Sequence, residues 1–214
     1  MPSTPPRAAP MLVRSVYVLV GERPWLDFVN TDDARRGARE DALRDFDSLV
    51  AWLEAAGLLD AERAVGMRRR AAQQPAGAAA ALVDARRVRS ALRALAERGS
   101  ASLQVRLDAM VEINRVLGRS AGTRRLDMRG DGSFARSFVP VGDAFAGLMI
   151  AVVESAADAL IGGELGRVRR CAGARCARVF YDATRNGARR WCDMTTCGNR
   201  AKAARHRLKI GMGA

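Results

Sequence analysis

The stretch Cys171-Ala-Gly-Ala-Arg-Cys176, followed after fifteen residues by Cys192-Asp-Met-Thr-Thr-Cys197, decides the fold of the last quarter of this chain. These are the four cysteines of a 214-residue sequence, and both pairs have the same four-residue gap. Two such pairs separated by a short spacer predict a site in which four thiolates surround one metal ion. Structural zinc is the expected occupant, because four thiolates close its tetrahedral shell and leave no position for a substrate.

Two disulfides are the competing interpretation of these cysteines, and redox-active thiols are a third. Disulfides are typical of small secreted domains, whereas residues 1–170 of this chain contain no cysteine. The apolar run from Met11 to Val20 is interrupted by Arg14, and no small-residue cleavage site follows it. Because we find neither a secretory signal nor an apolar run near the roughly 20 residues that span a bilayer, we expect a cytoplasmic protein without a membrane partner.

The residues around the cysteines predict a small folded module. Arg178 to Tyr181 is a strand-like run, and Arg185-Asn-Gly187 predicts a turn. Asp193 can cap a helix that begins near Met194, which puts Cys197 in the first turn, where the helix dipole favours a thiolate. A knuckle, a hairpin and a helix N-terminus around one zinc form a treble-clef-like zinc finger. The apolar cluster beside its metal would consist of Phe180, Tyr181 and Trp191.

The charge of the chain is concentrated in this module. The whole chain carries a formal net charge of +13, of which +11 lies between Arg167 and Lys209. A local basic patch is the electrostatic footprint of a polyanionic partner. We therefore expect nucleic acid, with duplex DNA as the first choice, while an acidic protein or a plain solvated face stays open. The expected nucleic-acid contacts are Arg185, Arg189, Arg190, Arg200, Lys202, Arg205 and Arg207.

The rest of the chain predicts a mainly helical domain behind a disordered tail at residues 1–10. Residues 11–20 are a candidate strand, residues 31–41 are polar and predict a loop, and residues 123–139 predict a hairpin that turns at Gly130-Asp-Gly132. Apolar residues at helical spacing predict helices that open at residue 25 and that cover 43–53, 60–72, 82–99, 103–117 and 143–161. The buried side of the fifth of these would carry Leu103, Leu107, Met110, Val111 and Leu117.

The sequence carries no pattern that predicts an enzyme. A single histidine leaves no Ser/His/Asp or Cys/His set, and the sequence has no phosphate loop or dinucleotide fingerprint. The acidic pairs Asp32-Asp33 and Asp60/Glu62 fit helix capping or solvation. We therefore expect a binding protein.

Three runs resemble two known families. Arg189-Arg-Trp-Cys-Asp-Met-Thr-Thr-Cys-Gly-Asn-Arg-Ala-Lys202 resembles the CGNR zinc finger family, whose namesake motif is Cys197-Gly-Asn-Arg200. The upstream Tyr181-Asp-Ala-Thr-Arg-Asn-Gly187 fits that family as well. Leu26-Asp-Phe-Val-Asn-Thr31 is similar to the opening motif of the ABATE domain, which usually precedes this finger. The resemblance implies one structural zinc per chain, with the ligands Cys171, Cys176, Cys192 and Cys197.

The sequence thus predicts a mainly α fold, with a helical ABATE-like domain at 11–163 that contains a small β-hairpin and a zinc finger at 164–214. The resemblance implies a stress-responsive bacterial transcription regulator, which would act in the cytoplasm at the nucleoid. The helical domain would sense a small-molecule ligand or mediate association into a homodimer. Two alternatives stay open: an RNA-binding factor, favoured by stacking aromatics, and a small-molecule-binding protein whose zinc module is purely structural, favoured by a deep pocket within residues 20–165.

Overall fold

The computed structural model describes residues 17–211, except 36–37, 120, 129–131, 133 and 144. For 33–35, 38–40, 135 and 208–211 it describes the backbone. The expected tail lies outside these residues, as does most of the candidate first strand, and residues 17–20 form no strand. The helices are α1 Pro24–Val29, α2 Phe46–Ala55, α3 Ala61–Gln73, α4 Pro75–Arg98, α5 Leu103–Arg119, α6 Ile150–Ile161 and α7 Asn199–Gly211.

The strands of the described part pair into antiparallel hairpins, and two irregular helical turns flank the C-terminal one. The paired strands are β1 Asp32–Arg35 with β2 Ala38–Asp41, β3 Gly122–Met128 with β4 Phe134–Pro140, and β5 Val168–Arg170 with β6 Val179–Tyr181. The two turns are a 3₁₀ turn, η1 (Glu164–Arg167), and a π-helical turn, η2 (Met194–Gly198). The predicted fold class, mainly α with a small hairpin and a four-cysteine module at the C-terminal end, is confirmed.

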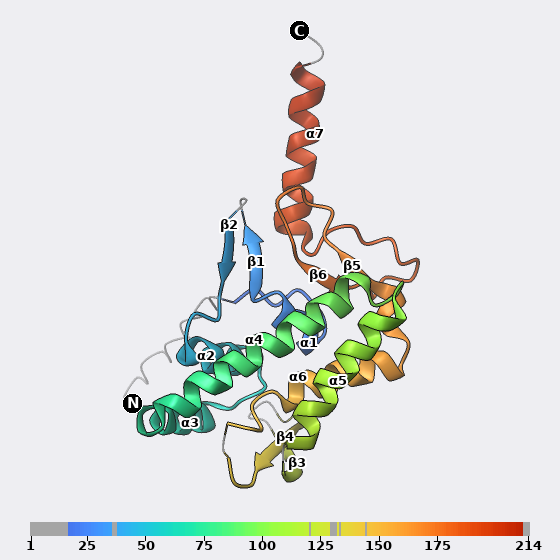
Figure 1. Ribbon diagram of the computed structural model, residues 1–214. Helices are drawn as coiled ribbons and strands as arrows, with labels where there is room; N and C mark the ends of the chain where they lie inside the picture. Colours follow the sequence, from blue (N-terminus) through green and yellow to red (C-terminus); the bar gives the residue numbers. More distant parts are fainter. Residues whose placement is uncertain are drawn as a thin grey trace, which may run out of the picture.

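A short central helix, α1, organises the helical body. It starts at Pro24, which tolerates the first helical position because no hydrogen bond is required of its nitrogen. Trp25, Leu26, Phe28 and Val29 are all fully buried, and α1 packs against α4, α6 and β6. Figure 1 shows α4 and α5 crossing the front of this body. Each large apolar side chain that is removed from water contributes about 1.5–3 kcal/mol, so α1 is a main source of cohesion.

Backbone caps set several helix boundaries; the cap at Asp60 was predicted, whereas α2 begins at Phe46 rather than at residue 43 because of a cap at Asp45. Asp45 accepts a hydrogen bond from the backbone N–H of Ser48, whose hydroxyl accepts one from Asp45 N, and together they begin α2. Asp60 caps α3 in the same manner through Arg63 N. Gly57, with φ of 68°, follows α2 in the left-handed conformation that favours glycine.

Other boundaries differ from the prediction. Within the segment predicted to be a loop, residues 32–35 and 38–41 form the paired strands β1 and β2. Arginines of α4 hold Asp32 and Asp41, and the local sequence does not reveal these distant partners. The gap predicted between the helices at 60–72 and 82–99 shrinks to one residue, because Pro75 begins α4 instead of interrupting a helix. Helix α6 begins at Ile150, since residues 145–149 form turns. The tip of β3–β4 lies mostly outside the described residues.

The predicted buried face of α5 is wrong. Four of its five residues are exposed: Leu103 (63%), Leu107 (41%), Met110 (44%) and Val111 (59%). The buried residues are Ala109, Ile113 and Val116, on the opposite side of the helix. Helix α5 is therefore apolar on two faces, and spacing alone could not decide which one meets α4 and α6.

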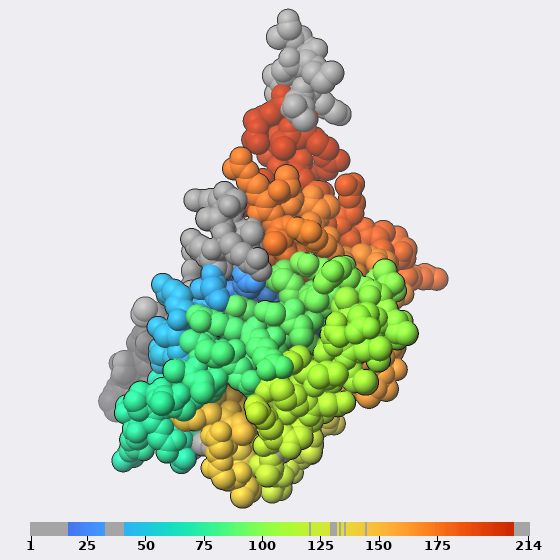
Figure 2. Space-filling view, in the orientation of Figure 1, coloured from blue at the N-terminus to red at the C-terminus, as the bar shows by residue number. Residues whose placement is uncertain are grey.

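The C-terminal module is seated on the helical body. Val179 of β6 is fully buried in the same apolar core as α1. Beyond this seat the chain rises through η2 into α7, which Figure 2 shows standing away from the body. The module therefore has one end in the core and the other in solvent.

Candidate metal centre and basic surface

The four cysteine thiols converge on one point. The sulfurs of Cys171, Cys176, Cys192 and Cys197 all lie within 4.8 Å of one another. Cys192 Sγ lies 3.8 Å from both Cys176 Sγ and Cys197 Sγ. A tetrahedral zinc with Zn–S bonds of ~2.3 Å requires sulfurs about 3.8 Å apart. The donor set and its spacing thus fit zinc, and none of these cysteines forms a disulfide.

The pKa shifts of the cysteine thiols also indicate that the cluster binds a cation. The hydrogen bond with Cys192 lowers the pKa of the Cys176 thiol to about 5, whereas that contact together with burial raises the pKa of Cys192. Burial and the neighbouring sulfurs raise the pKa of Cys197 to about 11. Without a cation the cluster therefore favours a thiolate at Cys176 and opposes thiolates at Cys192 and Cys197, and a divalent metal removes this conflict.

The backbone around the cysteines is shaped for this convergence. The N–H of Cys192 points at Cys171 Sγ, 3.4 Å away. A Cβ at Gly173 would lie 3.2 Å from Cys176 Cβ, so the first knuckle leaves little space for a side chain there. Asp193 caps η2 through the N–H of Thr195 and also accepts from the Thr195 and Thr196 hydroxyls. The predicted cap at Asp193 is thus confirmed, and Cys197 lies within η2.

The apolar cluster beside the metal differs in one residue from the prediction. Phe180 is fully buried against Cys171, Cys192 and Cys197, and Trp191 packs at its edge. Tyr181 belongs to the main core instead, with the Arg23 guanidinium 4.1 Å from its ring centre.

Arg189 has a different environment from the other predicted nucleic-acid contacts. Its guanidinium donates to Trp191 O (3.0 Å) and Cys192 O (2.6 Å) and lies 4.5 Å from the Phe180 ring centre. It also pairs with Glu22 of the helical body. All these contacts brace the loop that carries Cys192. The remaining predicted contacts are exposed: Arg185, Arg190, Arg200, Lys202, Arg205 and Arg207.

Sequence reasoning missed Asp182, which builds the loop that carries Arg185. Its carboxylate is fully buried and accepts hydrogen bonds from the Thr184 hydroxyl (2.5 Å), Thr184 N (3.0 Å) and Arg189 N (2.9 Å). These bonds, above all those from Thr184, lower the pKa of Asp182. The run Asp182-Ala-Thr184 is typical of an Asx turn, in which the Asp side chain accepts from the backbone N–H two residues later. This pattern could have identified Asp182 from the sequence.

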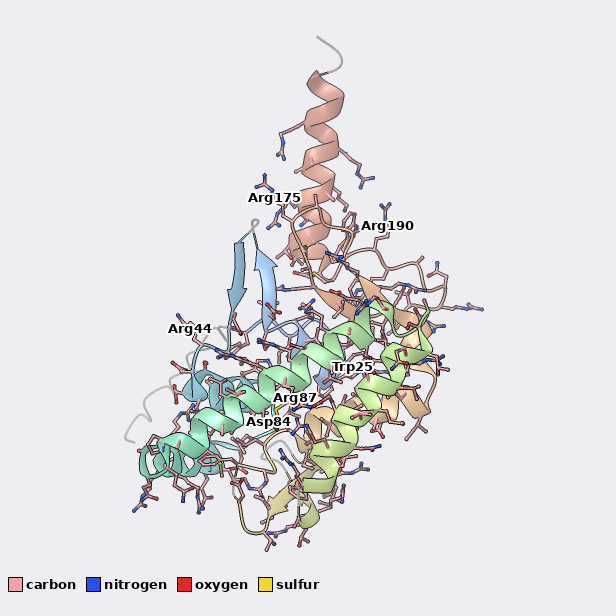
Figure 3. The ribbon with its side chains drawn as sticks, in the orientation of Figure 1. Trp25, Arg44, Asp84, Arg87, Arg175 and Arg190 are labelled. Carbon is pink, nitrogen blue, oxygen red and sulfur yellow. The ribbon has the colours of Figure 1, made fainter. Side chains whose placement is uncertain are left out.

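The surface around α7 is basic on more than one side. Described side chains from Lys202 to Arg207 are all exposed, and η2 is the main packing partner of α7 within the described residues. Figure 3 shows Arg175 and Arg190 near the base of α7. Arg175, an exposed residue of the first knuckle, was counted in the basic patch but not predicted as a contact.

The seam between module and body is polar and tightly bonded. The Asn30 side chain donates to Val179 O (2.8 Å) and accepts from Val179 N (2.9 Å). Arg93 of α4 donates to Ala177 O at 3.2 Å, and Arg23 forms a two-point ion pair with Glu164. The Leu26–Thr31 run therefore supplies both the central helix and the residue that holds β6.

A hollow of about 690 Å³ lies in the helical body, between α4, α5 and the segment before α6. Its walls combine apolar groups such as Phe145 and Met149 with charged ones such as Asp84, Arg87 and Arg119. A second hollow, of about 720 Å³, lies beside the metal centre and is lined by Trp191 and Met194 among others.

Among the described residues, no helix is long and apolar enough to cross a membrane.

Two family models match the chain in order. The ABATE model, described as a putative stress-induced transcription regulator, matches residues 22–163. The CGNR zinc finger model matches residues 167–209. No curated protein matches the chain in sequence.

Proposed function

The chain belongs to the ABATE family, and from this membership and the geometry of its zinc finger we propose that it is a stress-responsive, DNA-binding transcription regulator. One structural zinc, held by Cys171, Cys176, Cys192 and Cys197, would hold the knuckle and η2 together. Such a zinc has no open coordination position, so its role is to fix the orientation of α7 rather than to react.

The observation that carries this proposal is helix α7, which has basic and no acidic residues and whose described side chains are mostly exposed. Every described side chain from Lys202 to Arg207 is exposed. A helix of 13 residues is marginal when it stands alone in water, yet here α7 continues directly from η2, the turn that carries Cys197. A rigid basic helix that projects from a globular body is suited to the major groove of B-DNA, which admits an α-helix.

Duplex DNA is favoured over RNA by the state of the three aromatic residues of the finger. Sequence-specific RNA binding relies on aromatic faces that stack on unpaired bases. Phe180 is buried, Arg23 covers Tyr181, and the Arg190 guanidinium lies 5.3 Å from the Trp191 ring centre. The three aromatic faces are therefore already covered by other side chains and are not free to stack on bases. This supports contacts to the phosphate backbone and grooves of a duplex.

The test measures binding of the full chain to a mixed-sequence 24-base-pair duplex as KCl is raised. The variant K202A/R205A/R207A should flatten the slope of log K against log salt by up to about 2.7, if all three residues neutralise phosphates. The control R44A/R69A/R70A removes the same charge from exposed positions of the helical body and should leave the slope unchanged. Equal slopes for the α7 variant and the wild type would reject the proposal, as would tighter binding of a single-stranded RNA of equal length.

The hollow between α4 and α5 supports a second role, the sensing of a small molecule. Its apolar walls and the exposed guanidinium of Arg119 suit a small organic acid with an apolar body. A panel of aromatic carboxylic acids should contain members that raise the Tm of the wild type and fail to raise that of Arg119→Ala. If no member shifts the wild type, or if R119A responds equally, this role is rejected without affecting DNA binding.

A further inference from the structure

Three basic segments surround the metal centre. Arg175 directly precedes Cys176 in the first knuckle, and Arg190 lies two residues before Cys192. Helix α7 begins two residues after Cys197, at the end of η2. Because the four cysteine sulfurs lie within 4.8 Å of one another, a zinc bound to them holds the knuckle, the segment of Arg190 and α7 in one arrangement.

Backbone contacts join two of these segments independently of the metal. Ala172 N of the knuckle donates to Arg190 O at 2.8 Å. The N–H of Cys192 points at Cys171 Sγ, 3.4 Å away. The backbone of Arg190 is therefore fixed beside the knuckle that carries Arg175.

The side chains of Arg175 and Arg190 are both exposed. They differ in this from Arg189, whose guanidinium donates to the Cys192 carbonyl. Figure 3 shows Arg175 and Arg190 on opposite sides of the lower end of α7. The Arg190 guanidinium lies 5.3 Å from the Trp191 ring centre, a contact that leaves its positive charge in place. The base of α7 thus has an exposed guanidinium on either side.

The acidic residues of the finger do not neutralise these two arginines. Asp182 and Asp193 are the acids between residues 167 and 209. Each accepts hydrogen bonds within its own loop, Asp182 from Thr184 and Asp193 from Thr195. Neither of the two exposed arginines forms an ion pair within the described part of the chain. Both are therefore available to an anionic partner.

We propose that Arg175 and Arg190 form a phosphate clamp, which holds the two DNA backbones on either side of the groove that receives α7. The inference rests on the proposed function and adds how the finger is seated on the duplex. The major groove is about 12 Å wide and is bordered by the phosphates of both strands. A guanidinium can donate two parallel hydrogen bonds to one phosphate.

The clamp and α7 have different tasks in this arrangement. Phosphate contacts fix the position and orientation of a protein on the duplex but carry no sequence information. Arg175 and Arg190 would therefore set the orientation in which α7 enters the groove, and the side chains of α7 would face the bases. The zinc matters to the clamp because it fixes the spacing between the two guanidinium groups and the helix.

The first test measures the salt dependence of binding for full-length variants on the same 24-base-pair duplex. R175A and R190A should each flatten the slope of log K against log salt by up to about 0.9, and R175A/R190A by up to about 1.8. R175K/R190K should keep most of the wild-type slope, because lysine retains the charge. The control R44A/R69A removes two exposed arginines of the helical body and should match the wild type. Zinc content and Tm verify that each variant is folded.

The second test needs no variant. Wild-type protein is treated with phenylglyoxal, which modifies exposed arginines, and the modified residues are identified by mass spectrometry. A saturating amount of the duplex should protect Arg175 and Arg190 and leave Arg44 and Arg69 as reactive as in the free protein. If either Arg175 or Arg190 stays fully reactive, the clamp is overturned. This result also decides the matter if R175A/R190A proves unfolded.

The outcomes separate the clamp from the proposed function. If K202A/R205A/R207A flattens the slope while R175A/R190A does not, the clamp is overturned and DNA binding by α7 stands. If R44A/R69A flattens the slope as much as R175A/R190A, the effect is one of total charge and the clamp is likewise overturned. If the wild type binds no DNA, both proposals fall.

Discussion

Arginine has opposite roles in the helical body and in the C-terminal helix. In the body, several arginines are paired with acids: Arg68 with Asp47 and Glu54, Arg87 with Glu112, Arg89 with Asp41, and Arg115 with Asp84. In α7, Arg200, Arg205 and Arg207 are exposed and form no ion pair among the described residues. The same residue type thus holds the body together and leaves the finger with unneutralised charge.

This contrast indicates that the local balance of charge, rather than the abundance of arginine, distinguishes the proposed DNA-binding surface from the body. A paired arginine is neutralised and adds little to the field outside the protein, whereas an unpaired one attracts polyanions over a Debye length of about 10 Å. Arg189 is instructive because it lies in the finger but contacts Glu22 of the body, like a body arginine. Removing the metal, a paired arginine or the polar seam should therefore produce effects of different kinds.

The largest effect should follow from breaking the metal site. Cys192→Ser should release the zinc and unfold the finger, because structural zinc can contribute ~10 kcal/mol to the folding of such a module. Elemental analysis should find one zinc per wild-type chain and none per variant chain, and DNA binding should be lost. The helical signal of the body should largely persist, since α1 to α6 keep most of their apolar core.

A reversibility control separates metal loss from general damage. Wild-type protein treated with a chelator should regain DNA binding when zinc is added back, whereas Cys192→Ser should not. A purified, reduced wild type that contains no metal, or a Cys192→Ser protein that retains its zinc, would contradict the prediction.

The second largest effect should separate the two kinds of arginine. Arg89→Ala leaves Asp41 and Thr31 without their buried partner and should lower the free energy of unfolding by about 3 kcal/mol. Arg205→Ala, at an exposed and unpaired position, should change it by less than about 0.5 kcal/mol. Urea unfolding measures both. If Arg89→Ala and Arg205→Ala had the same free energy of unfolding, the difference between paired and unpaired arginines would have no effect on stability.

Regular local signals explain what could be predicted from the sequence. Cysteine spacing identified the metal-binding set, and the caps at Asp60 and Asp193 were predictable because each carboxylate accepts from a backbone N–H two or three residues away. Such information is contained within one short window of sequence. The domain boundary at 163/164 remains a prediction.

Distant partners explain what could not be predicted. The hairpin at 31–41 depends on Arg89 and Arg93, some fifty to sixty residues away, so its polar residues predicted only a loop. The brace formed by Arg189 depends on backbone carbonyls and on Glu22, which no spacing encodes. The face of α5 that is buried depends on where α4 and α6 pack, and both of its faces are apolar.

A smaller effect should arise at the seam between body and finger. Asn30→Ala removes two hydrogen bonds and leaves the backbone N–H and carbonyl of Val179 buried without their partner, at a cost of about 2 kcal/mol. Because Val179 lies in β6, the variant should also release zinc faster to a chelator. The control Asn186→Ala changes an exposed asparagine of the same finger and should behave like the wild type. Unchanged zinc release in Asn30→Ala would show that the seam does not support the finger.

The smallest predicted effect concerns the pH dependence of stability, and it arises at Asp27 in α1. Burial raises the pKa of Asp27 to about 6, although its carboxylate accepts a hydrogen bond from Gly21 N at 2.7 Å. Since the pKa of the folded state is higher than that of the unfolded state, the folded protein binds more protons between pH 4 and pH 6. Stability from this group is therefore present at low pH and falls as pH rises through that window.

Asp27→Asn isolates that contribution, because the amide oxygen can still accept from Gly21 N but does not titrate. The stability of the variant relative to the wild type should increase by about 1 kcal/mol between pH 5 and pH 7. Urea unfolding at the two pH values gives this difference directly, and carboxylates with lowered pKa values, such as Asp182, cancel because both proteins contain them. A relative stability that stays constant or moves in the opposite direction would show that the carboxylate is compensated in the fold, as the paired arginines of the body are.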